Sequence, residues 1–134
     1  MYYIQTVMKN NILKFTIYLY YLSLIVLLVL YLYPGSIIGY FLHNNSSIQP
    51  QITRDFLISS NHFYVFIFLS VIGILAYKNS KKINFLIKYL FLISVMLEFF
   101  HIYVPNRSFE LSDLFGNIVG VIVVVVVYKI KQKI

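Results

Sequence analysis

The chain has 134 residues, of which 60% are hydrophobic and 11% are charged, and its mean hydropathy is +0.82. A soluble domain carries charge on roughly a quarter of its residues, so this composition excludes an ordinary soluble protein and predicts a membrane protein. Cysteine is absent, which excludes disulfides, zinc–thiolate sites and a cysteine nucleophile. The net charge of +7 comes from lysines beside apolar segments, which favours contact with a lipid bilayer and no nucleic-acid partner.

Four apolar segments are predicted to be transmembrane helices, and together they give an all-α bundle. They cover residues 12–33, 61–77, 83–104 and 113–130. Each can cross a hydrocarbon core of about 30 Å, with some mismatch for the shorter two. The fourth contains the run Val123–Val127, which is typical of a buried strand in soluble proteins. An open strand in lipid leaves backbone groups unpaired, so we predict a helix there.

The first segment has an alternative interpretation as a cleaved signal peptide. Its apolar run is longer than the usual 7–15 residues, and YPGSIIG is a poor cleavage site, so we favour a retained span. The polar linker 34–60 after it is predicted to be an extracytoplasmic loop with little regular structure.

The distribution of lysine predicts the topology of a multi-pass protein in the cell membrane. All nine lysines precede the first span, flank the connection between the second and third spans, or follow the last span. The other two connections contain Arg54 and Arg107 beside acidic residues. By the positive-inside rule, both termini are cytoplasmic.

Ionisable residues interrupt the third span. Ser94, Glu98 and His101 are spaced i, i+4 and i+7, which places them on one helix face. Pro105 is predicted to end this helix, so Glu98 should lie about 10 Å below the outer boundary. A charged side chain at membrane depth costs at least ~2.5–3.5 kcal/mol, so Glu98 must be neutral, paired or beside a wet cavity. His101 is either its hydrogen-bond partner or an acid or base.

The fourth span repeats this spacing with Asp113, Asn117 and Gly120, and His62 begins the second span at the same outer surface. Gly116 and Gly120 form a GxxxG pattern, which is typical of close packing against another helix and leaves a homo-oligomer open.

The turn before the fourth span has two open assignments. Ser112 or Asp113 can cap the helix. Arg107 either pairs with Asp113 or Glu110, or remains available to an anion.

Six residues at fixed spacing carry a family resemblance. The pattern E-x6-P-x-R-x5-D-x3-N-x2-G is formed by Glu98, Pro105, Arg107, Asp113, Asn117 and Gly120. It resembles the signature of VanZ-like membrane proteins, and HFYVFIF, which begins at His62, is similar to the histidine region of that family. The family often has glutamine where this chain has His101. The resemblance implies a four-helix transmembrane domain over residues 12–130, and the family's namesake is associated with resistance to the glycopeptide teicoplanin.

Three functions fit these residues. The first is a cell-envelope protein that binds a lipid or cell-wall precursor headgroup through a polar pocket, with ligand-binding residues His62, Glu98, Arg107, Asp113 and Asn117. The second is an enzyme acting on a lipid-linked phosphate, for which Glu98 and His101 are candidate acids or bases. The third is a structural or assembly role. We favour binding, because no HExxH, Gly-x-Ser-x-Gly or P-loop pattern is present. We assign no catalytic residue and expect neither a metal site nor a cofactor.

Overall fold

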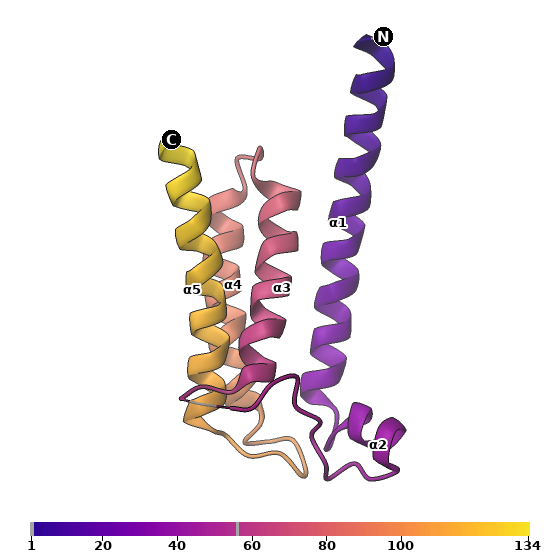
Figure 1. Cartoon of the computed structure of the whole chain (residues 1–134), viewed down its shortest axis with the longest axis vertical. Helices are drawn as coiled ribbons and strands as arrows, with labels where there is room; N and C mark the ends of the chain where they lie inside the picture. Colours follow the sequence, from indigo (N-terminus) through magenta and orange to yellow (C-terminus); the bar gives the residue numbers. More distant parts are fainter. Residues whose placement is uncertain (1, 56) are drawn as a thin grey trace.

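The computed structural model describes residues 2–55 and 57–134, and these residues form helices joined by turns and loops (Figure 1). The helices are α1 (Tyr2–Leu32), α2 (Ile37–His43), α3 (Ser60–Tyr77), α4 (Ile83–Phe100) and α5 (Leu111–Lys133). All of them except the short α2 are long and apolar enough to cross a membrane. The predicted all-α fold with four membrane-spanning helices is confirmed, and the valine run lies within α5 as expected.

The four long helices run alternately up and down (Figure 1). Helices α3, α4 and α5 form a three-helix unit, and α1 packs beside it, mainly against α3. Both chain ends and the α3–α4 turn lie at one end of the bundle, while α2 and the two longer loops lie at the other end. The lysine-rich segments are therefore at one end and the predicted polar residues at the opposite end.

The closest helix contact joins α3 and α5. A Cβ atom added to Gly116 would lie 2.8 Å from the Ser59 carbonyl oxygen, and one added to Gly120 would lie 2.7 Å from the Phe63 carbonyl oxygen. Both distances are too short for any side chain, so only glycine allows this approach. The GxxxG pattern seen in the sequence is therefore used within the chain, against α3, and does not argue for a homo-oligomer.

The linker predicted to be irregular contains α2. Ser36 begins this helix, and its hydroxyl accepts a hydrogen bond from the Gly39 backbone N–H. The helix ends at Asn44 in the left-handed conformation, a common way to stop a helix. The following strap, residues 49–55, is tied to the start of α3, because the Asn61 side chain accepts from the Ile52 N–H and donates to the Pro50 carbonyl.

Two predicted helix boundaries near the polar residues are wrong. Helix α4 ends at Phe100 rather than Val104, because the chain tightens into successive turns in which Ile102 and Tyr103 bond to the carbonyls three residues earlier. Glu98 therefore lies in the last turn of α4, nearer the helix end than the sequence predicted. Helix α5 begins at Leu111 after Glu110, and no side chain caps it, so neither Ser112 nor Asp113 is the cap.

The predicted topology can be tested because the chain has no cysteine. We expect a membrane-impermeant maleimide to label Ser47→Cys in intact cells, because residue 47 lies at the end of the bundle opposite the lysines. Asn79→Cys, in the α3–α4 turn, should be labelled only after the membrane is permeabilised. Labelling in the reverse pattern would mean that both termini are outside.

We also predict that Gly120→Val destabilises the bundle. The added atoms would meet the backbone of Phe63, which cannot move without separating α3 from α5. Overpacking of this kind costs about 1–3 kcal/mol and should lower the thermal unfolding temperature of the protein in detergent. Val126→Ile enlarges an exposed side chain on the same helix and should leave that temperature unchanged.

Candidate functional site

Tyr31, near the end of α1, connects the polar groups of all four long helices. Its hydroxyl donates a hydrogen bond to the Asn117 side-chain oxygen at 2.7 Å and lies 3.0 Å from Nδ1 of His62. Its backbone carbonyl lies 3.1 Å from Nε2 of His101, and its ring stacks on that imidazole with centroids 5.5 Å apart. The side chain is buried, so this tyrosine lies inside the bundle and not at the lipid interface.

His62 lies between groups from two other helices. Its Nδ1 atom is 3.1 Å from Oδ1 of Asn117 and 3.7 Å from Oε2 of Glu98, and its Nε2 atom is 3.2 Å from Oδ2 of Asp113. The Asn117 amide is oriented by its other end, which donates to the Ser94 carbonyl at 3.1 Å. The imidazole is therefore held between two carboxylates, with Asn117 and Tyr31 beside it.

Glu98 is completely buried, with 0% of its surface exposed. Its Oε1 atom accepts a hydrogen bond from the Glu110 backbone N–H at 3.0 Å and lies 3.3 Å from Nδ1 of His101. Because Nε2 of His101 faces a carbonyl, which only accepts, a proton belongs on that nitrogen. A second proton must lie between His101 Nδ1 and Glu98 Oε1 for that contact to be a hydrogen bond. The pair thus ties α4 to the loop before α5.

Arg107, in the loop between α4 and α5, points back to α1. It donates from a terminal nitrogen to the Leu30 carbonyl at 3.1 Å, and its buried Nε has no hydrogen-bond partner among the described residues. Among the described residues it forms no salt bridge, so of the two assignments left open by the sequence the pairing with Asp113 or Glu110 is absent. Burial lowers the pKa of the guanidinium, whereas the Asp113 and Glu98 carboxylates oppose that shift. An arginine remains charged in proteins, so the site contains a half-buried cation without a paired anion.

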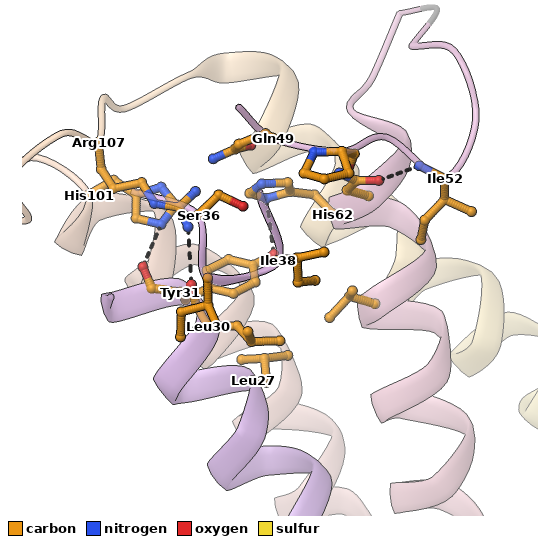
Figure 2. Close-up of a pocket in the computed structure, with 14 residues that line it drawn as sticks. Leu27, Leu30, Tyr31, Ser36, Ile38, Gln49, Ile52, His62, His101 and Arg107 are labelled. Atoms are coloured by element: carbon orange, nitrogen blue, oxygen red, sulfur yellow. Dashed lines mark hydrogen bonds between the residues drawn. The ribbon is translucent and has the colours of Figure 1, made fainter. Parts of the chain in front are cut away.

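A cavity of about 150 Å³ opens beside these groups, between the end of α1, the start of α3 and the strap (Figure 2). Its polar lining comes chiefly from Tyr31, Ser36, Gln49, His62, His101 and Arg107. Below it, a larger apolar groove of about 580 Å³ runs between α1 and α3. The two share part of their lining, namely Leu27, Leu30, Ile52 and Val65.

The structure brings all five predicted ligand-binding residues to one end of the bundle, but in two layers. His62 and Arg107 line the cavity, whereas Glu98, Asp113 and Asn117 lie behind it. Their roles in binding remain predictions. The catalytic candidate His101 also lines the cavity, with both ring nitrogens facing protein acceptors.

Sequence reasoning missed Tyr31. One of thirteen tyrosines, it lies near a span end, where an interfacial position is the usual expectation. Nothing in its local sequence separates it from Tyr33, which is exposed. Its role could be found only from the packing of α1 beside α3.

Comparison with known proteins gives one family match. The family model described as VanZ/LLP1 matches residues 15–132, which includes the second half of α1, all of α3 and α4, nearly all of α5 and every residue of the polar site. No curated protein and no solved structure gives a significant match.

We predict that Tyr31→Phe weakens the bundle by about 1 kcal/mol, because it removes the hydroxyl that donates to Asn117 in a buried network. The thermal unfolding temperature in detergent should fall accordingly. Tyr33→Phe removes the hydroxyl of an exposed neighbour and is the matched control. Equal effects of the two substitutions would contradict a stabilising role for the hydrogen bond from the Tyr31 hydroxyl to Asn117.

Proposed function

The chain belongs to the VanZ/LLP1 family of multi-pass membrane proteins, and we propose that it binds an anionic amphiphile, a lipid or lipid-linked cell-wall precursor. The headgroup would occupy the polar cavity, and the hydrocarbon chain would follow the groove between α1 and α3. The observation that carries this proposal is that the two spaces adjoin, since four residues line both of them.

The size and chemistry of the cavity support a small anionic headgroup. A cavity of this volume holds a ligand of roughly six heavy atoms, which is close to the size of one phosphate group. Arg107 offers a charged donor whose Nε is unused, and arginine suits phosphate and carboxylate because its donors are arranged in a fixed fork. The close-up in Figure 2 shows Arg107 and His62 on opposite sides of the space, with Gln49 near its rim.

The groove supports a ligand that enters from the bilayer. Its walls are almost entirely apolar, formed by residues such as Leu22, Val26, Tyr64 and Phe68. A chain that lies there keeps its hydrocarbon away from water, while its headgroup reaches the cavity at the end of the bundle. A water-soluble anion would use only the cavity.

The hydrogen bonds favour binding over catalysis. A general acid or base must be within reach of the substrate proton that it transfers. Both nitrogens of His62 and both nitrogens of His101 face protein atoms among the described residues, and Glu98 lies behind the cavity wall. These groups are arranged to hold one another, which suits a rigid binding site.

Binding to a purified protein tests the proposal. We expect Arg107→Gln to weaken binding of a medium-chain polyprenyl phosphate by about 10- to 100-fold, because a charge-assisted hydrogen bond contributes about 1.5–3 kcal/mol. The measurement is a titration in detergent followed by native mass spectrometry. Arg54→Gln, which removes the other arginine from an exposed position, should bind as the unmodified protein does.

The matching polyprenol, which lacks the phosphate, should bind weakly to the unmodified protein and equally weakly to Arg107→Gln. Equal binding of phosphate and alcohol would mean that the cavity does not select an anion. Turnover of the phosphate, lost in Glu98→Gln, would establish the enzyme instead. In cells, a link to glycopeptide resistance predicts that expression lowers teicoplanin susceptibility and that Arg107→Gln abolishes the effect.

A further inference from the structure

One oxygen of the buried Glu98 has no partner. Its Oε1 atom has two nitrogen neighbours, but Oε2 accepts no hydrogen bond from any described residue and is shielded from solvent. Nδ1 of His62 lies 3.7 Å from Oε2, which is too far for a hydrogen bond. A buried carboxylate oxygen without a partner is unfavourable, so its environment indicates a missing positive centre.

One other acceptor atom lies close to the same nitrogen of His62. Oδ1 of Asn117 and Oε2 of Glu98 lie 3.1 and 3.7 Å from Nδ1 of His62. Ligands at about 2.1 Å from a metal ion are about 3.0–3.4 Å apart in octahedral or tetrahedral geometry. The separation of 3.1 Å falls within that range and that of 3.7 Å lies slightly above it. The three groups come from α3, α4 and α5.

Asp113 sets the histidine in the form that binds a metal. Its Oδ2 atom lies 3.2 Å from Nε2, and a carboxylate at that position favours a proton on Nε2. Without an ion, Nδ1 donates its own proton to Oδ1 of Asn117, which only accepts. A bound metal ion would displace that proton, and the lone pair of Nδ1 would then face Glu98 and Asn117. Carboxylate–histidine–metal arrangements of this kind are usual in metal sites, where the carboxylate orients the ring. One ligand atom from each of His62, Glu98 and Asp113 lies within 4.8 Å of the others, so both carboxylates add negative charge to the site.

We propose that Nδ1 of His62, Oε2 of Glu98 and Oδ1 of Asn117 bind one divalent transition-metal ion, with Asp113 as the positioning residue. One imidazole with two oxygen donors suits Zn²⁺ or Mn²⁺ better than Mg²⁺ or Ca²⁺, which prefer oxygen alone. The ion reaches the site through the cavity, which His62 also lines. No metal site was expected from the sequence, and its ligands are far apart along the chain. The proposal is independent of the headgroup site, since Arg107 takes no part in it.

The test uses full-length protein that is purified in detergent through a tag without histidine. Mass spectrometry of elements should find about one Zn²⁺ or Mn²⁺ per chain. A chelator should remove the bound ion. Adding Zn²⁺ or Mn²⁺ to the stripped protein should then give saturable binding in calorimetry and raise the unfolding temperature of the protein. Glu98→Gln should abolish that binding, and Asp113→Asn should weaken it by about 10- to 100-fold.

Glu110→Gln is the matched control, because its side chain is exposed and only its backbone contacts Glu98. It should bind the ion as the unmodified protein does. Glu98→Gln could lower the yield of folded protein, so a second test uses the unmodified protein after treatment with the chelator. If that chain shows no saturable binding and no thermal shift with either ion, the proposal is overturned; full binding by Glu98→Gln overturns it as well.

Discussion

The contact between α3 and α5 determines where the polar groups of this protein meet. Gly116 and Gly120 lie against the α3 backbone near Ser59 and Phe63. The two helices therefore approach more closely than any residue with a side chain at these two positions would permit. At that distance, His62 on α3 is brought within 3.2 Å of Asp113 and 3.1 Å of Asn117 on α5. Small residues allow such approaches between membrane helices, where lipid provides no hydrophobic force to drive helices together. Packing and polar chemistry are thus parts of one arrangement.

Burial explains why the network is so fully connected. In an apolar medium, each unpaired donor or acceptor costs free energy, so polar groups persist there only with partners. Ser94 contributes its carbonyl, Glu110 its backbone N–H and Tyr31 both its hydroxyl and its carbonyl. Backbone groups therefore hold the side chains as much as side chains hold one another. Within this network two buried atoms have no partner among the described residues, Arg107 Nε and Glu98 Oε2; elsewhere in the bundle the Tyr20 and Ser70 hydroxyls also lack one.

The sequence predicted the helices and their polar faces because hydropathy and helical spacing are local properties. Ser94 and Glu98, which the i, i+4 spacing places on one face of α4, are both buried, and so is Asn117 on α5. The end of α4 could not be predicted, because Pro105 permits the helix to stop early and the turns at His101 depend on its contact with Glu98. Tyr31 also could not be predicted, since its partners come from helices thirty or more residues away. The packing of α1 against α3 decides which polar residues line the cavity and which lie behind it. Hydropathy and helical spacing within one segment do not predict that packing.

Charge balance limits what the cavity can bind. Glu98 and Asp113 lie behind its wall and would repel an anionic headgroup; Arg107 and the proton shared by His101 and Glu98 offset these two charges but leave no net positive charge for a ligand. A second positive centre is needed, either a proton on His62 or a metal ion beside its Nδ1 atom. Both would be held at the junction of α3, α4 and α5, between the carboxylates and the cavity. An anion in the cavity would then face Arg107 on one side and the second centre on the other, as electrostatic complementarity requires. In the proposed anion site, the buried carboxylates would hold positive charge beside the cavity, which would account for acidic residues next to an anion.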